Sequence, residues 1–455
     1  MEELFDLRLQ EMLQQAELGP GALSGLTDRL RAFVRPFGDL LVGAQQRRTH
    51  EYVSGLLSKL EKKTGESIAY LHDQDRQGIQ IFVGQDDWDH QPLADLLARQ
   101  IGNDLGEVDG VLVFDPSGFA KKGKKSVGVT RQWCGRLGKV ENCQVGIYLG
   151  YVARQEHALV DMRLYLPAEW TGDRARCEEA GVPRGTRLRT RHELALEMLD
   201  RHGSVLPHAW VTGDDEMGRP AHFREDLRRR SERYLLAVPA NTLIRDLEVD
   251  PPAYTGHGRR PDRPFQRVER WRAAQPETAW TPIDVRDGEK GPLVIEVLQR
   301  RVQTRTRNGP GAHEALFVTR ERQADGCYKH DYYLSNEITG VSNAEFARVA
   351  KAEHRIEECL KRAKSEAGLG DYQVRNWVGW HHHQILSLVA AWFLVGETRR
   401  GKNPDPRSDG SAPPRHDRES VGSTMAQPYP ADDRASYQPL DAADRAGSIL
   451  SPSRA

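Results

Sequence analysis

The 455-residue sequence lacks several features that would each assign it to a class of protein. Its five cysteines are odd in number and scattered, with no CxxC pair. This argues against a disulfide framework or a zinc knuckle and favours a reducing compartment. No apolar run approaches the roughly 20 residues that span a bilayer, and the amino terminus MEELFDLRLQ has no apolar centre like that of a signal peptide. We therefore expect a cytoplasmic protein with no membrane partner.

Net charge is also nearly absent. The chain has 65 Lys and Arg against 66 Asp and Glu, a formal charge of −1, which excludes a polycation. The charge is nevertheless unevenly distributed. Seven basic and no acidic residues lie between Pro116 and Val140, and residues 255–310 contain 12 basic against 7 acidic residues. Because a nucleic acid is bound by a local basic surface rather than by net charge, this distribution favours a nucleic-acid partner.

The expected secondary structure is typical of an α/β fold with a polar tail. Short β-branched strands precede an alternation of helices and strands, which predicts a sheet covered by helices. The final 55 residues contain 8 of the 25 prolines and no Phe or Trp, so they cannot form a core and we expect disorder. The expected segments are a helical amino-terminal region (1–105), a first α/β part (106–240), a β-rich insertion (241–312), a second α/β part with long helices at 342–368 and 373–395 (313–397), and a disordered tail (398–455).

Two acidic residues follow predicted strands. Asp115 comes after the strand VLVF, which we expect to end at the turn signal DPSG, and Asp214 comes after the strand AWVT. Carboxylates at one edge of a sheet converge even when they are far apart in the sequence. A third acid from a packed helix would complete an oxygen site suited to Mg²⁺ or Mn²⁺.

The long helix at 342–368 offers that third acid. At about 100° per residue, Glu357 and Lys364 lie together on the shoulder of an apolar stripe, whereas Glu358 points toward solvent. Glu357 is therefore the better candidate ligand, and Lys364 is a candidate phosphate contact beside it. From spacing alone, ordinary surface charges on an amphipathic helix remain an open alternative.

A cationic segment follows Asp115. Its lysines suit a phosphodiester substrate, because cations position the backbone while metal ions perform the chemistry; a solvated basic hairpin is the competing interpretation. The lysines are Lys121, Lys122, Lys124 and Lys125.

Three other motifs were candidates for chemistry. Residues 118–126 nearly match a P-loop, but Lys125 occupies the place of the required Ser or Thr and no helix is expected to follow. The run His381-His382-His383 fans out around a helix, so it predicts a polar helix start rather than a metal site. Trp271 and Trp280, in the basic insertion, could stack on unpaired bases, although core packing is an equal alternative.

Over about residues 30–397, the chain resembles bacterial insertion-sequence transposases of the DDE type. The stretches that carry the resemblance are VLVFDPSGFAKKGKKSVGVTRQWCGRLGKVENCQVGIYLGYV, MRLYLPAEW, HAWVTGDDEMGR, YLLAVP and RIEECLKRAKSEAGLGDYQVRNWVGWHHH. The resemblance implies an α/β, RNase H-like (retroviral-integrase superfamily) fold. In that fold a mixed sheet is flanked by helices, a helical DNA-binding region precedes it, and a β-rich insertion comes before the catalytic helix.

Carried over by position, the resemblance implies a catalytic, metal-binding triad of Asp115, Asp214 and Glu357. Asp214 is preferred to Asp215 because the family's second acid lies four residues before a glycine, here Gly218. The family's helix carries a Tyr, an Arg three residues later, the catalytic Glu four after that and a Lys seven beyond. Glu357 and Lys364 match this pattern.

The same helix departs from the family at two places. Ala350 stands in the place of the Tyr and Glu353 in the place of the Arg, with Arg355 as a partial substitute for that Arg. The DNA-binding residues that we expect are Lys121, Lys122, Lys124, Lys125, Arg355 and Lys364.

The resemblance implies metal-dependent cleavage and transfer of DNA strands in cut-and-paste transposition, with two Mg²⁺ or Mn²⁺ ions. The implied partners are the terminal inverted repeats and the target DNA, bound by a homodimer at the bacterial nucleoid. Two alternatives stay open: a catalytically inactive, DNA-binding regulatory derivative, and a P-loop-like NTPase.

Overall fold

A computed structural model describes residues 24–402, apart from residues 259, 289 and 290. Residues 398–402, which we expected to begin the disordered tail, continue a helix, and the rest of that tail lies outside the described residues. Within the described part of the chain, no helix is long and apolar enough to cross a membrane.

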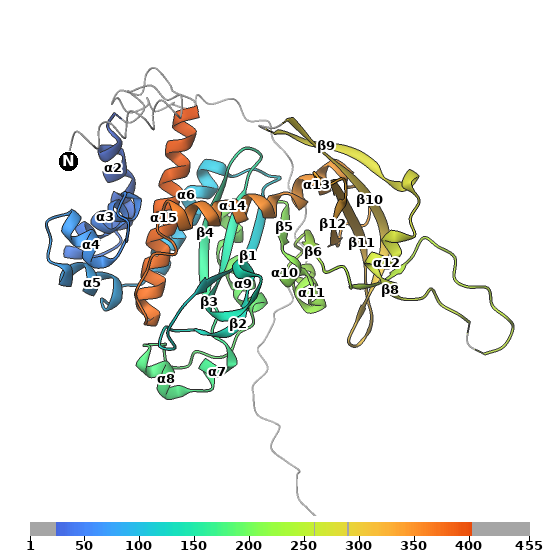
Figure 1. Ribbon diagram of the computed structural model, residues 1–455, viewed down its shortest axis with the longest axis horizontal. Coiled ribbons are helices and arrows are strands. Elements are labelled where there is room, and N and C mark those ends of the chain that lie inside the picture. The colour runs from blue at the N-terminus through green and yellow to red at the C-terminus, as the bar shows by residue number, and fades with distance from the viewer. Residues whose placement is uncertain (1–23, 259, 289–290, 403–455) are drawn as a thin grey trace, which may run out of the picture. The chain divides into compact units, whose positions relative to one another are not determined.

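The described chain begins with a group of helices that packs against the last helix. Two of them start at side-chain caps: Thr64 accepts a hydrogen bond from the backbone N–H of Ser67, and Asp75 accepts one from Gln77. In Figure 1 the last helix, α15, lies between α2–α5 and the sheet, whereas α6 packs against the sheet itself. The helices are α2 (Leu26–Gly38), α3 (Ala44–Leu57), α4 (Gly65–Leu71), α5 (Arg76–Gly84) and α6 (Gln91–Leu105), with α15 at Trp377–Lys402.

A mixed sheet forms the centre of the fold, and β1 lies in its middle (Figure 1). β1 is antiparallel to β3 and parallel to β5, β5 is parallel to β6, and both β2 and β4 pair with β3. Together with its flanking helices, this arrangement confirms the expected RNase H-like mixed sheet. The strands are β1 (Val111–Ala120), β2 (Thr130–Cys134), β3 (Lys139–Val152), β4 (His157–Leu164), β5 (Trp210–Gly213) and β6 (Tyr234–Ala237).

Helices cover this sheet, and α14 crosses it against β1, β3 and β4 (Figure 1). The single helix expected at 342–368 is two helices, because Lys351 adopts a tightened turn with ψ of −8° between them. The helices after β4 include α7 (Ala168–Thr171), α8 (Arg174–Glu179), α9 (Arg191–His202), α10 (Asp215–Gly218), α11 (Ala221–Arg229), α13 (Asn343–Ala350) and α14 (Ala352–Ser365), with the short 3₁₀ turn η3 (Gly203–Val205). Another 3₁₀ turn, η2 (Gly135–Leu137), lies between β2 and β3.

A β-rich segment lies where we expected an insertion, and its strands extend the central sheet in the order β6–β12–β11–β10–β7–β8. It has a separate core that includes Trp271, Trp280 and Leu316. Its strands continue past residue 312, where we expected the insertion to end. The elements are β7 (Leu243–Asp246), β8 (Gln266–Arg267), α12 (Val268–Ala273), η4 (Glu277–Ala279), β9 (Thr281–Gly288), β10 (Gly291–Thr306), β11 (Gly309–Arg322) and β12 (Tyr328–Ser335).

Candidate active site

Asp115 lies inside a strand, not at its end as we expected. β1 continues through the sequence DPSG to Ala120 and pairs with β3 along its whole length, with Asp115 opposite Tyr148. Pro116 is tolerated there because β5 pairs with β1 only as far as Phe114, so beyond that residue β1 has a neighbour on one side only. The turn prediction was therefore wrong, because long-range strand pairing outweighs the local signal.

The register of two parallel strands brings the two candidate aspartates together. Phe114 and Gly213 are the last paired residues of β1 and β5, and Asp115 and Asp214 come directly after them. The strands approach closely here, since a Cβ on Gly213 would lie 2.9 Å from the carbonyl oxygen of Phe114. Both carboxylates therefore lie at the same edge of the sheet, as the sequence predicts.

The electrostatics of this edge are dominated by uncompensated negative charge. Burial, and then the charges of Asp214 and Glu357, hold the pKa of Asp115 well above its usual value, while Lys364 opposes this shift. Burial likewise raises the pKa of Asp214 to about 7, against the hydrogen bond that its carboxylate accepts from the backbone N–H of Met217 at 3.0 Å. A cation bound between the two aspartates would relieve this cost.

Helix α14 brings the other two matched residues toward β1. Lys364 Nζ donates a hydrogen bond to Ser117 Oγ at 2.7 Å and lies 4.9 Å from the centre of the Phe119 ring, two to four residues beyond Asp115 on β1. Glu357 lies two turns earlier, is 57% exposed, and has its Oε2 3.4 Å from Nδ1 of His354. The charge of Glu357 reaches Asp115, but its carboxylate is turned to a neighbour on its own helix.

Glu353, an acid of the same helix that stands where the family has an Arg, also lies at this site. It lies one turn before Glu357, is half-buried, and has no hydrogen bond or ion pair among the described residues. Burial and the charges of Asp214, Glu357 and Asp115 hold its pKa well above the usual value. The signal that could have found it is the four-residue spacing from Glu357, which places both on one helix face.

The expected DNA-binding cations fall into two groups. Lys121 is half-buried with its Nζ 3.4 Å from the centre of the Tyr372 ring, and burial lowers its pKa to about 8. Lys122 and Lys124 are exposed, and Lys125 pairs with Glu179 at 2.9 Å. Lys121 lies six residues beyond Asp115, about 20 Å along the strand, so the structure does not bring these lysines to the acids.

The structure does not bring Arg355 to the acids. Its guanidinium donates to the carbonyl oxygens of Ala153 at 2.7 Å and Arg154 at 3.1 Å, and to that of Gln155. The turn follows Val152 of β3, which pairs with Val111 at the amino end of β1. Val111 lies about 13 Å along the strand from Asp115. Arg355 therefore braces a turn and does not replace the arginine of the family.

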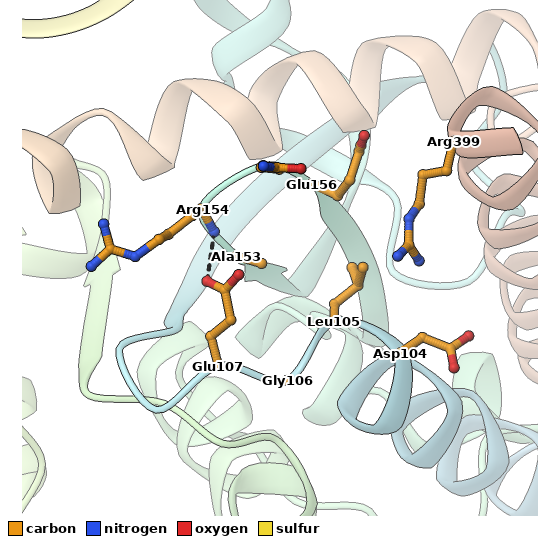
Figure 2. A pocket seen from close by; sticks show the side chains of 9 residues that line it. Asp104, Leu105, Gly106, Glu107, Ala153, Arg154, Glu156 and Arg399 are labelled. Atoms are coloured by element: carbon orange, nitrogen blue, oxygen red, sulfur yellow. Dashed lines mark hydrogen bonds between the residues drawn. The ribbon is translucent and has the colours of Figure 1, made fainter. Parts of the chain in front are cut away.

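A cavity of about 360 Å³ lies at that amino end (Figure 2). Arg154 donates its backbone N–H to Glu107 Oε2 at 2.7 Å across it, and Arg399 of α15 reaches toward it. None of the candidate catalytic acids lines this cavity. The cavity therefore belongs to the surroundings of the β3–β4 turn and not to the candidate catalytic site.

One further expectation is corrected, and the structure bears on two alternatives that the sequence left open. The histidines 381–383 are buried rather than a polar helix start, with ring nitrogens 2.7–3.1 Å from groups such as the carbonyl oxygens of Trp88 and Gly368. Trp271 and Trp280 are buried in the core of the insertion, so neither can stack on a base. The segment after Ser126 enters strand β2, so no helix amino terminus follows the near-P-loop and the NTPase alternative loses its phosphate cradle.

Comparison with known proteins identifies the family. A family model described as a DDE superfamily endonuclease matches residues 36–292, more than half of the chain. The chain belongs to the DDE superfamily of endonucleases. This membership confirms the resemblance to insertion-sequence DDE transposases, and divalent-metal chemistry is implied by the superfamily.

This DDE protein is also similar to a curated protein and to a solved structure. It is 27% identical over 194 residues to a probable transposase for insertion sequence element IS701 from Microchaete diplosiphon, which is 42% of this chain and 48% of that protein. The match thus spans about half the length of the curated relative. A solved structure of the piggyBac transposase synaptic complex with hairpin DNA aligns with 82% of this chain and 73% of its own, at a TM-score of 0.35 and 9% identity.

The donor chemistry of the site fits the metal that the superfamily implies. Asp115 and Asp214 offer the hard carboxylate oxygens that Mg²⁺ and Mn²⁺ prefer, in a half-buried setting with little positive charge nearby. Between residues 24 and 402, outside the gaps at 259 and 289–290, no three His, Cys, Asp or Glu side chains are already grouped to hold a metal ion. The edge thus presents a pair of aspartates, with the third acid of the family on α14.

Proposed function

We propose that this DDE protein is the transposase of an insertion sequence, which cuts and joins DNA strands in cut-and-paste transposition. The observation that carries the proposal is the placement of Asp115 and Asp214 directly after the last paired residues of β1 and β5. Two acids brought to one sheet edge at an energetic cost, in a chain of this superfamily, are best explained as ligands of the metal ions that cleave DNA.

Asp115, Asp214 and Glu357 would hold the ions. Bound divalent ions would supply a nucleophile at neutral pH and stabilisation of the leaving oxygen. In cleavage, the oxygen of water bonds to phosphorus, the bond from phosphorus to the 3′ oxygen breaks, and that oxygen takes up a proton. In strand transfer, the oxygen of the freed 3′-hydroxyl loses its proton and bonds to the phosphorus of a target phosphodiester. The bond from that phosphorus to the 3′ oxygen of the target breaks, and this leaving oxygen takes up a proton.

The chain's own cations position the DNA. Lys364 is held by Ser117 beside the acids, where its charge suits a phosphate next to the cleaved bond. The exposed lysines Lys122 and Lys124, with Lys121 and Lys125, would hold phosphates further along the strand. The solved piggyBac complex contains DNA, and by analogy we propose double-stranded DNA as the partner of this chain.

The remaining assignments of the proposal follow from the family. The amino-terminal helices α2–α6 would recognise the terminal inverted repeats, and a homodimer would hold two element ends together. We place the protein in the bacterial cytoplasm, associated with the nucleoid when it acts.

A cleavage assay tests the proposal. Purified protein is mixed with DNA that carries the inverted repeats flanking its gene, with Mg²⁺ or Mn²⁺ or with EDTA. We expect nicks at the repeat ends only with metal, and none from Asp115→Asn. Cleavage that is unchanged by Asp115→Asn would overturn the site assignment.

A catalytically inactive, DNA-binding derivative is the second candidate. It is favoured by Ala350 and Glu353, which stand where the family has a Tyr and an Arg, and by the engagement of Arg355 elsewhere. In the same assay it predicts salt-sensitive binding to the repeats without any metal-dependent cleavage.

A further inference from the structure

A second cavity, of about 460 Å³, lies against the acidic edge. Its lining includes Asp214 itself, together with Pro116 and Gly118 of β1 and Val145 of β3. The floor is tightly packed, since a Cβ on Gly118 would lie 2.8 Å from the Sγ of Cys134. The cavity therefore offers an apolar floor next to the proposed site of DNA cleavage.

One wall of this cavity is an exposed tryptophan. Trp133 of β2 lines it and is 53% exposed, whereas the other eight tryptophans of the chain are buried or half-buried. Trp133 lies opposite Val140 across the β2–β3 hairpin, outside the hydrophobic cores of the described residues. An indole ring left in water is costly to the free protein, so a ligand that covers it would gain binding energy.

The charges of the cavity select the kind of ligand. Its two arginines are already engaged: Arg191 pairs with Glu216, and Arg219 pairs with Asp215 at 3.1 Å. The lining acids, which include Asp214, outnumber these arginines. A phosphate inside the cavity would thus meet no spare positive charge, whereas an uncharged aromatic ring would meet an apolar floor and an indole face.

We propose that this cavity holds an unpaired nucleobase of the DNA strand being cut, stacked on Trp133. The base would belong to a nucleotide close to the cleaved phosphodiester, because Asp214 both lines the cavity and forms part of the proposed metal-binding edge. Taking a base out of the duplex costs energy that stacking on an aromatic side chain offsets. The inference rests on the proposed function.

The test asks whether the loss of affinity on removing the Trp133 indole depends on the presence of one particular base. Full-length protein carrying Asp115→Asn, which blocks cutting, is titrated with repeat-end DNA in which one nucleotide at a time is abasic. The same titrations are made after Trp133→Ala, after Trp133→Phe, and after Val140→Ala. Val140 is a matched control because it is 51% exposed and lies opposite Trp133 without lining the cavity.

We expect Trp133→Ala to weaken binding of intact DNA by roughly 10- to 100-fold, the size of one lost base–aromatic stack. Trp133→Phe should retain most of the affinity, and Val140→Ala should retain all of it. At one position near the cut, the abasic nucleotide and Trp133→Ala should each weaken binding, but the two together no more than either alone.

Additive losses at every position would overturn the inference, as would equal losses from Trp133→Ala and Val140→Ala. A change in oligomeric state on Trp133→Ala, without coupling to any base, would assign the exposed indole to a protein interface instead. If the protein with Trp133 intact fails to bind repeat-end DNA at all, the proposed function itself is contradicted, and this inference with it.

Discussion

The fold buries ionic groups in two places, and it treats them in opposite ways. Between α11 and the insertion, Arg224 and Glu314 are 5% and 1% exposed, and they form an ion pair at 2.8 Å. Thr304 and Tyr234 also donate hydrogen bonds to Glu314, at 3.0 and 2.6 Å. Every charge in this cluster has a partner, so its role is to fix the insertion onto the core.

The carboxylates of Asp115 and Asp214, at the sheet edge where the pairing of β1 and β5 ends, have no such ion-pair partners in the described part of the chain. We call this the unpaired edge. The carboxylate of Asp115 has no hydrogen bond among the described residues, and Lys364 is the one cation among the main influences on its pKa. The free protein thus carries a destabilising concentration of negative charge here. Breaking a buried ion pair by removing one partner destabilises a fold, whereas a buried charge without a partner lowers stability from the start and is kept for binding.

The largest expected effect comes from neutralising the unpaired edge. Asp115→Asn should reduce metal-dependent cleavage by at least about 1,000-fold, since ligands that act as a unit fail together. It should not lower the free energy of unfolding, because an ionised carboxylate whose pKa is raised opposes folding at neutral pH. Gel assays of cleavage and urea unfolding of the same preparations measure the two quantities.

A loss of stability comparable to the loss of activity would contradict this prediction, because it would place Asp115 among the paired, structural charges. Asp250→Asn is the control, since Asp250 is exposed and lies in the β-rich insertion, beyond β7. We expect it to leave both quantities nearly unchanged.

The paired cluster should show the reverse behaviour. Arg224→Ala leaves Glu314 buried without its partner, and we expect the free energy of unfolding to fall by about 3–5 kcal/mol. Cleavage per folded molecule should change little, because Arg224 does not line the cavity beside Asp214. Urea unfolding gives the first quantity, and cleavage normalised to the folded fraction gives the second.

Arg229→Ala serves as the control for Arg224→Ala. Arg229 lies on the same helix, and its ion pair with Asp226 is exposed, so the loss should stay below about 1 kcal/mol. Equal effects of the two substitutions would show that burial of the Arg224–Glu314 pair contributes nothing to stability.

The sequence was sufficient to predict the unpaired edge but not the elements around it. Asp115 and Asp214 each follow a short β-branched strand, and parallel strands carry such residues to one edge without any further information. The extension of β1 past Asp115 could not be predicted, because its cause is pairing with β3, where Asp115 faces Tyr148. A local turn signal contains nothing about that pairing.

The other errors have the same physical origin. His382 is buried because its ring meets the carbonyl oxygens of Val83 and Trp88, almost 300 residues earlier in the chain. Trp271 and Trp133 both lie in basic segments, yet only tertiary packing decides that the first is 2% exposed and the second 53%. Periodicity reports which face of an element is apolar, but not what covers that face.

Two of the three glutamates of α14, Glu353 and Glu357, give a sharper test of the unpaired edge, with the smaller effect expected at Glu353. Glu357→Gln should abolish cleavage as Asp115→Asn does, if Glu357 is the third ligand. Glu353→Gln should weaken Mn²⁺ binding by about 10- to 100-fold, as expected for a residue beside the ligands. Calorimetric titration of Mn²⁺ without DNA measures this, with the exposed Glu358→Gln as a neutral control.

The reverse ranking, with Glu353→Gln abolishing cleavage and Glu357→Gln tolerated, would make the half-buried Glu353 the third ligand. Arg224→Ala should leave the Mn²⁺ affinity unchanged, whichever of the two glutamates is the third ligand. The ranking therefore separates the two helix positions without disturbing the comparison between the two clusters.

The smallest effect is a dependence of stability on pH that only the unpaired edge should produce. Burial raises the pKa of Asp214 to about 7 in the folded chain, above the value of about 4 expected for an unfolded aspartate. The folded state therefore binds more protons between these values. The stabilisation is fully present below about pH 4 and is lost as the pH rises through 7.

Without metal, urea unfolding of the unsubstituted protein should thus show a decline in the free energy of unfolding from pH 5 to pH 8 that Asp214→Asn reduces. Asp250→Asn, at an exposed aspartate of the insertion, should leave the decline intact, and added Mg²⁺ should oppose it above pH 7, where the ionised carboxylate can bind the cation. If Asp214→Asn and Asp250→Asn gave the same profile, Asp214 would ionise like a surface aspartate, and the contrast between paired and unpaired burial would fail at this residue.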